Sequence, residues 1–200
     1  MKKLVYLISP NKIDQNFFAS LDKVLSFKNV KFFQLRLKNL SQKKLLNFSK
    51  RIIKITTKHK VKFIINDNFI LASKIKVDGC HMGQLDGSFK IARKKLKGKI
   101  LGITCHNSKI LANNAIENKA DYIAFGSFSK SKLKPNAKKA NIKVLKWAKK
   151  NIKKPIVVIG GINNVNYKRL IKAGAKYIAI SSFIWDNPNL KPETAIRKFK

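Results

Sequence analysis

Two carboxylates stand where the chain could bind a divalent cation. Asp67 follows the apolar run 63–65, and Asp86 closes a segment that begins at Asp78. The chain has nine Asp and Glu against 45 Lys and Arg, so an acid at such a place favours a role that lysine cannot fill. Carboxylate oxygens are ligands that Mg²⁺ prefers, and a substrate phosphate can complete the shell. We therefore predict that Asp67 and Asp86 bind Mg²⁺.

An amide and two cations alternate in the segment Gln34-Leu-Arg36-Leu-Lys38. In an extended strand these three side chains point to the same side. Such a set would suit a phosphate or pyrophosphate group. The alternative is a solvated strand edge in a chain that is rich in lysine.

The segment between Asp78 and Asp86 also contains His81 and Gln84. For His81 we favour a hydrogen-bonded interior histidine over a catalytic one. Asp78 stands at the start of its predicted strand, which favours a turn residue at the end of the molecule opposite Asp67 and Asp86.

Polar residues follow the fifth and sixth apolar runs as well. Thr104 and His106 follow the fifth, with the cysteine Cys105 between them. Ser131 and Lys134 lie in a long loop rich in Lys and Ser. That loop is either a mobile surface segment or a lid that places Lys134 on an anion.

Small residues follow the last two apolar runs. They are the pairs Gly160-Gly161 and Ser181-Ser182. Glycines and hydroxyls after the seventh and eighth strands of a barrel commonly bind phosphate through backbone N–H groups.

The elements that must position these residues are short apolar runs separated by amphipathic segments. We predict strands at 4–8, 30–35, 62–65, 79–82, 100–103, 122–125, 156–159 and 177–180, and helices at 15–27, 42–59, 69–75, 89–96, 108–118, 141–151, 164–173 and 192–200. Eight strand–helix units without a break in composition predict one domain over residues 1–200, a parallel eight-stranded (β/α)8 TIM barrel. An open doubly wound sheet is the alternative, but no glycine fingerprint follows the first strand.

Composition and charge exclude several classes of protein. An apolar fraction of 44% is enough for a core, and two cysteines make no disulfide framework or zinc motif. No apolar run is long enough for a membrane span, so we expect a cytoplasmic protein. The net charge of +36 attracts anions. Only five of the 45 cations are Arg, and they are spread over the chain, which argues against specific nucleic-acid binding.

Taken in chain order, these motifs resemble the thiamine-phosphate synthase family over about residues 4–185. Gln34-Leu-Arg36-Leu-Lys38 is similar to the family's pyrophosphate segment Q-x-R-x-K. Asn66-Asp67 resembles its asparagine and first magnesium ligand, and the segment ending in Asp86 resembles D-G-x-H-x-G-Q-x-D, whose last residue is the second ligand.

Later positions extend the resemblance. Thr104 stands where the family has a serine that touches the pyrimidine, and Lys134 where it has a pyrophosphate lysine. The two small-residue pairs fall where the family holds the thiazole phosphate. The loop after the sixth strand departs from the family's G-P-x-x-x-T-x-T-K, with Ser131 for the first threonine and Leu133 for the second.

The resemblance implies an enzyme that joins hydroxymethylpyrimidine pyrophosphate to thiazole phosphate in a Mg²⁺-assisted, dissociative reaction. The residues predicted to bind substrate are Gln34, Asn66, Gln84, Thr104, His106, Ser131, Gly160, Gly161, Ser181 and Ser182; those predicted to be catalytic are Arg36, Lys38 and Lys134. The alternatives are a thiazole tautomerase and a degenerate basic barrel that binds RNA or phosphorylated ligands. The sequence leaves a homo-oligomer open as a further alternative. We expect Cys105 to be a structural residue.

Overall fold

In the computed structural model of the chain, which describes residues 4–38, 40–129 and 140–200, the strands close into a parallel barrel. The strands are β1 (Val5–Ile8), β2 (Val30–Leu35), β3 (Lys62–Asn66), β4 (Gly79–Met82), β5 (Ile100–His106), β6 (Tyr122–Gly126), β7 (Ile156–Ile159) and β8 (Tyr177–Ile180). Each pairs with its neighbours in sequence order, and β1 pairs with β8. The predicted barrel is confirmed, and the open sheet is wrong.

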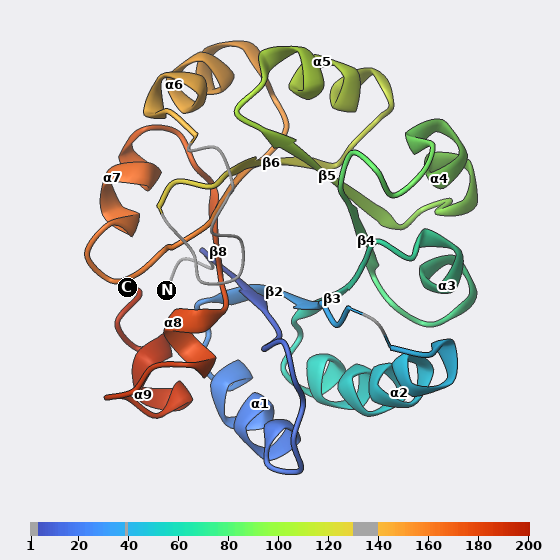
Figure 1. The fold of residues 1–200 in the computed structure, drawn as a ribbon, viewed down its shortest axis with the longest axis vertical. Helices are drawn as coiled ribbons and strands as arrows, with labels where there is room; N and C mark the ends of the chain where they lie inside the picture. The colour runs from blue at the N-terminus through green and yellow to red at the C-terminus, as the bar shows by residue number, and fades with distance from the viewer. Residues whose placement is uncertain (1–3, 39, 130–139) are drawn as a thin grey trace.

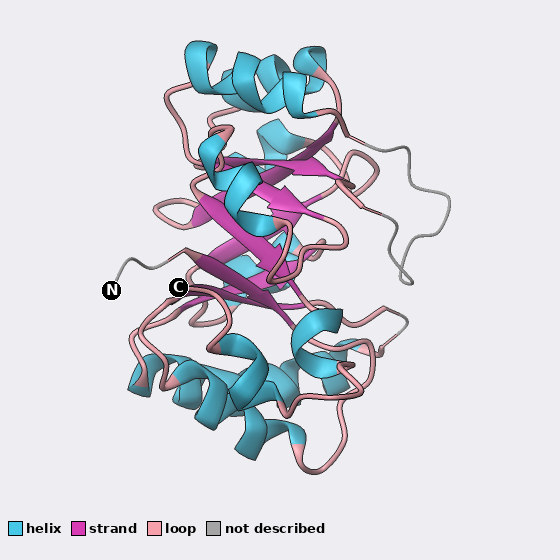
Figure 2. Ribbon diagram, turned by 90° about the vertical axis from the view of Figure 1, so that its left-hand side faces the viewer, coloured by secondary structure: helices cyan, strands magenta, loops and turns pink. Residues whose placement is uncertain are grey.

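Helices surround the barrel, as Figure 1 shows along its axis and Figure 2 from the side. They are α1 (Phe17–Leu25), α2 (Gln42–Lys58), α3 (Phe69–Lys74), α4 (Phe89–Lys95), α5 (Lys109–Glu117), α6 (Ile142–Asn151), α7 (Tyr167–Lys172), α8 (Ser182–Trp185) and α9 (Pro192–Ile196). Polar caps start several of them; the side chains of Ser41 and Ser88 accept hydrogen bonds from N–H groups of the first turns of α2 and α4. None of the helices in the described ranges is both long and apolar enough to cross a membrane.

Strand alternation divides the apolar residues between two cores. One core lies between the strands and the helices and includes Leu7, Phe33 and Ile65. The other fills the barrel itself and includes the aromatic residues Tyr6, Phe32, Tyr122 and Tyr177. The barrel is therefore packed below the level at which its strands end.

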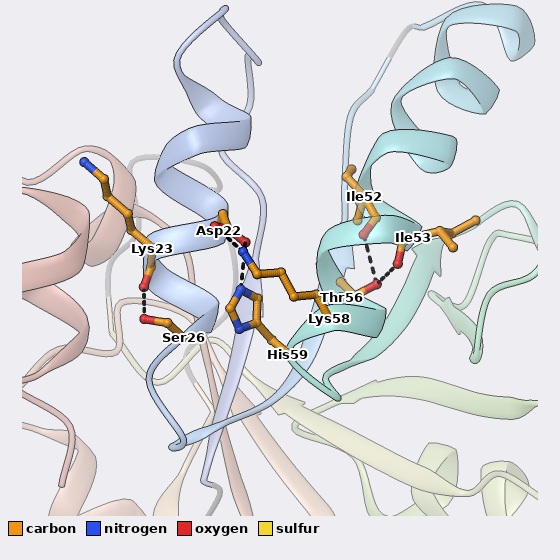
Figure 3. Close-up of polar contacts among 8 residues, drawn as sticks. All are labelled: Asp22, Lys23, Ser26, Ile52, Ile53, Thr56, Lys58 and His59. Carbon is orange, nitrogen blue, oxygen red and sulfur yellow. Dashed lines mark hydrogen bonds and ion pairs between the residues drawn. The ribbon is translucent and has the colours of Figure 1, made fainter.

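Ion pairs and backbone contacts hold the outer layer and the amino-terminal ends of the strands. Figure 3 shows Asp22 of α1 between Lys58 and His59 at the end of α2, at 2.9 and 2.7 Å. Asp78, just before β4, accepts hydrogen bonds from the Phe63 N–H and from Lys62 Nζ at 2.8 and 2.7 Å. Asp78 thus lies at the amino-terminal end of the barrel, as predicted.

Several differences from the sequence prediction affect the loops around the carboxyl ends of the strands. β3 and β6 each end one residue later than predicted, at Asn66 and Gly126. β5 continues past Ile103 to His106, with a register shift after Thr104. α7 begins at Tyr167 because the Asn163 side chain accepts the N–H groups of Val165 and Asn166 and makes a turn there. The short helix α8 was not predicted.

Candidate active site

A cavity of about 950 Å³ opens at the carboxyl ends of the strands. All of the predicted site residues that the structure describes line it: Gln34, Arg36, Lys38, Asn66, Asp67, Gln84, Asp86, Thr104, His106, Gly160, Gly161, Ser181 and Ser182. Ser131 and Lys134 lie outside the described residues. The chain therefore brings residues that are distant in sequence, from the ends of many strands, to one hollow.

Asp67 and Asp86 lie against each other in this cavity. Burial, followed by hydrogen bonding to Asp86 and the charge of Asp86, raises the pKa of the Asp67 carboxyl from 3.8 to about 7. The charges of Arg36 and Lys38 act in the opposite direction and lower it. The two carboxylates predicted to share a cation are thus adjacent.

The backbone holds both carboxylates in place. Asp67 has a positive φ of 63°, uncommon for a residue with a side chain, and its N–H donates to the His81 carbonyl at 2.8 Å. The Asp86 carboxylate accepts the N–H of Gly83 within its own loop. A strained backbone that neighbouring strands hold in place is typical of functional sites.

Two carboxylates alone make an incomplete cation site. No group of three or more His, Cys, Asp or Glu side chains suited to a metal occurs in the parts of the chain that the structure describes. Two hard carboxylate oxygens fit Mg²⁺, which keeps waters and takes oxygens from substrate phosphates. The donor set therefore fits a cation that binds together with a phosphorylated substrate.

Polar contacts also order the β1–β3 side of the cavity. The Gln34 amide donates to Asn66 Oδ1 at 2.7 Å, which joins β2 to the end of β3. The Arg36 N–H donates to the Ser9 hydroxyl at 3.0 Å, and Ser9 lies at the end of β1. Arg36 and Lys38 are thereby presented to the cavity on the side of Asp67.

Glycines bring the β6 and β7 loops close together. A Cβ on Gly160 would lie 2.0 Å from Ser127 Oγ, so a side chain is excluded there, and Gly160 and Gly161 have positive φ values of 97° and 60°. Asn166 donates to the Gly161 carbonyl at 2.8 Å and fixes the loop. This wall of the cavity consists mainly of backbone and small side chains.

The end of β8 is tied to β1. Ser181 donates its hydroxyl to the Ser9 carbonyl at 2.9 Å, and Trp185 of α8 donates to the Ile8 carbonyl at 2.6 Å. Ser182, the first residue of α8, lines the cavity beside Ser181. The Ser181 hydroxyl thus links strands besides facing the cavity.

His81 is a hydrogen-bonded residue of the barrel interior, as expected, and it also lines the cavity. His81 is buried, with Nδ1 at 3.0 Å from the Tyr122 hydroxyl and Nε2 at 2.8 Å from Thr104 Oγ1. Gln84 donates to the Thr104 carbonyl. Cys105 is fully buried, and burial raises the pKa of its thiol to about 12, which favours a protonated thiol and the structural role expected for it.

Sequence reasoning missed several cavity residues. Ser9, Asn107, Ser108 and Ser127 all line the cavity and follow β1, β5 or β6. The signal that located Asp67 and Thr104, a polar residue directly after a strand, would have found Ser9 as well.

Comparisons with known proteins agree with this arrangement. A family model described as thiamine monophosphate synthase matches residues 5–184. The thiamine-phosphate synthase of Pelagibacter ubique is 54% identical over 200 residues, which is 100% of this chain and 97% of that protein. The thiamine-phosphate synthase of Erythrobacter litoralis is 39% identical over 186 residues, covering 90% of this chain and 87% of that one.

A solved structure supports the fold. Thiamine phosphate pyrophosphorylase from Pyrococcus furiosus superimposes with a TM-score of 0.87 at 23% identity, covering 98% of this chain and 93% of that one.

Proposed function

The chain belongs to the thiamine monophosphate synthase family of transferases, and on that premise we propose that it joins hydroxymethylpyrimidine pyrophosphate to thiazole phosphate and releases pyrophosphate. The observation that carries the proposal is the pair Asp67 and Asp86, held together beside Arg36 and Lys38 in one cavity. The two adjacent carboxylates suit a divalent metal ion. The flanking Arg36 and Lys38 suit a pyrophosphate anion that would bind to the same metal ion.

The reaction makes one main electrostatic demand. When the pyrimidine–oxygen bond breaks, negative charge grows on the departing pyrophosphate. Arg36 and Lys38, which line the cavity, would bind that charge, and the Arg36 N–H is hydrogen-bonded to the Ser9 hydroxyl. Mg²⁺ bound by Asp67 and Asp86 would supply further positive charge to the same group. No covalent nucleophile is needed, which agrees with the buried, protonated state of Cys105.

The second substrate would occupy the opposite wall. Gly160, Gly161 and Ser182 present backbone and small side chains to the cavity, which suits the phosphate of a thiazole. A volume of about 950 Å³ is enough for two small ring compounds side by side. The thiazole nitrogen would then capture the carbocation left on the pyrimidine, away from bulk water. Two buried reduced cysteines fit a reducing cytoplasm, where we propose that the enzyme acts.

The direct experiment incubates the full chain with both substrates, with and without Mg²⁺, and measures thiamine phosphate and pyrophosphate. We expect both products in equal amounts and none with excess chelator. A tautomerase or a binding protein would release no pyrophosphate, and that result would contradict the proposal.

A further inference from the structure

Four hydrogen-bonded side chains run from the barrel interior up to the cavity, which His81 and Thr104 line. The Tyr6 hydroxyl lies 2.7 Å from that of Tyr122, which lies 3.0 Å from His81 Nδ1. His81 Nε2 lies 2.8 Å from Thr104 Oγ1. Tyr6 and Tyr122 are 1% and 2% exposed, whereas Thr104 lines the cavity. The series therefore begins in the core and ends at the wall that faces substrate.

The first member decides the direction of donation. Among the described residues, the Tyr6 hydroxyl hydrogen-bonds only to the Tyr122 hydroxyl. A buried O–H without an acceptor is more costly than an unused lone pair, so Tyr6 donates and Tyr122 accepts. Tyr122 must then donate its own proton to His81 Nδ1. An imidazolium would leave that proton without an acceptor, so the imidazole is neutral.

The protonation of His81 sets the direction of the next hydrogen bond, the one to Thr104. A neutral imidazole that accepts at Nδ1 has its proton on Nε2, so Nε2 donates to Thr104 Oγ1. The Thr104 oxygen therefore accepts from the histidine, and the threonine proton remains for a partner in the cavity.

The surroundings hold the two central rings in this arrangement. The rings of His81 and Tyr122 are stacked at 7° with centroids 5.6 Å apart. A Cβ on Gly102 would lie 1.9 Å from the Tyr122 ring, so glycine at this position makes room for the tyrosine. Burial raises the pKa of both Tyr6 and Tyr122, which keeps the two phenols protonated as donors.

We propose that Tyr6, Tyr122 and His81 are positioning residues that oblige Thr104 to donate a hydrogen bond to a ring nitrogen of the pyrimidine substrate. The inference rests on the proposed function. Thr104 is still within β5, whereas Arg36 and Lys38 follow the end of β2. The acceptor beside Thr104 therefore belongs to the ring at the floor of the cavity, with the pyrophosphate nearer the rim.

The test uses analogues of the pyrimidine pyrophosphate in which one ring nitrogen at a time is replaced by C–H. For each analogue the ratio of kcat/KM between parent and analogue is measured. We expect the native enzyme to discriminate about tenfold against one analogue, because the Thr104 donor is then left unpaired. Thr104→Val should remove the discrimination, and Thr104→Ser should keep it.

The positioning role has its own variants. Tyr6→Phe removes the proton that sets the direction, so the series can reverse and discrimination should fall to about two- to threefold. Tyr177→Phe is the matched control, because Tyr177 lies in the same interior core but does not line the cavity. It should leave the ratio unchanged. If Tyr6→Phe does not fold, Tyr122→Phe serves in its place.

Two results would overturn the inference. One is a native enzyme whose kcat/KM for each of the two analogues equals its kcat/KM for the parent. The other is undiminished discrimination in folded Tyr6→Phe or Tyr122→Phe. Failure of the proposed function is a different outcome, since it would leave the parent substrates themselves without product.

Discussion

At the amino-terminal end of the barrel each of two strand-flanking carboxylates has a cation and a backbone N–H as partners, whereas at the carboxyl-terminal end two carboxylates lie against each other. Asp78 accepts from Lys62 and the Phe63 N–H, and Asp121 accepts from Arg93 and the Leu101 N–H. Asp67 instead has Asp86 as its neighbour, and its pKa is raised.

On the proposed function, this difference separates stability from function within one fold. Paired carboxylates join neighbouring strands and lower the free energy of the folded state. A carboxylate placed beside another raises that free energy, and the arrangement is explained when a ligand of opposite charge occupies the site.

The largest effect is expected for Asp67→Asn. The amide removes one of two proposed Mg²⁺ ligands, so kcat/KM for thiamine phosphate formation should fall about a thousandfold. Binding of thiazole phosphate, measured by calorimetry, should persist, since Gly161 and Ser182 are unchanged. Asp14→Asn, the same substitution at an exposed site, is the control. Full turnover by Asp67→Asn would contradict the proposal that Asp67 is a Mg²⁺ ligand.

The opposite pattern is expected for Asp78→Ala. This change leaves the buried Phe63 N–H without its side-chain acceptor, so unfolding free energy should fall by about 1–3 kcal/mol in urea titrations. The variant should keep nearly native kcat/KM at a temperature where it is folded. A large loss of activity in the folded protein would contradict the separation of the two ends.

The stability of the metal-free protein should depend on pH through Asp67. The pKa of its carboxyl is about 7 in the folded protein against an ordinary value of 3.8, so between these values the folded state binds more protons than the unfolded one. The contribution is fully present below about pH 4 and is lost as pH rises through 7. We expect a loss of about 1–2 kcal/mol from pH 5 to pH 8 that Asp67→Asn does not show. Saturating Mg²⁺ with pyrophosphate should reduce the loss at pH 8; an equal loss in Asp67→Asn would exclude this carboxyl as the cause.

The smallest effect is expected on the outer layer. Asp22→Asn removes the charge between Lys58 and His59, and partly exposed ion pairs contribute little. Unfolding free energy should change by about 0.5 kcal/mol, with activity unchanged. A loss as large as that of Asp78→Ala would mean that the helix layer, and not the strand ends, sets stability.

Local patterns predicted most of the fold. Four of the strands have the predicted bounds, because short β-branched and aromatic runs such as Val30–Leu35 are buried on both faces. The helix α8 was missed, since four residues are too few to show a period, and its Trp185 donates a hydrogen bond to Ile8, a contact between distant segments. The predicted start of α7, residue 164, is three residues too early. The Asn163 side chain accepts the N–H groups of Val165 and Asn166, so a turn stands there and the helix begins at Tyr167.

The candidate site was predictable where one residue type is unusual for its place. Asp67 stands out in a lysine-rich chain, and polar residues at strand ends are readily noticed. Contacts between distant segments could not be predicted from local patterns. The partners of His81 lie 23 and 41 residues away in sequence, and Ser9 and Arg36 are 27 residues apart. They meet because β1 pairs with β2 and because β4, β5 and β6 lie side by side, which local sequence patterns do not specify.

Because β1 pairs with β8, the barrel cannot close until the last part of the chain has been synthesised. Ser9 and Ser181 are 172 residues apart, and Ile8 and Trp185 are 177 apart. During synthesis on the ribosome the first seven strands can form only an unclosed sheet with two bare edges, which other nascent chains could extend. An abundance of lysine would make such intermediates repel one another until Trp185 has emerged.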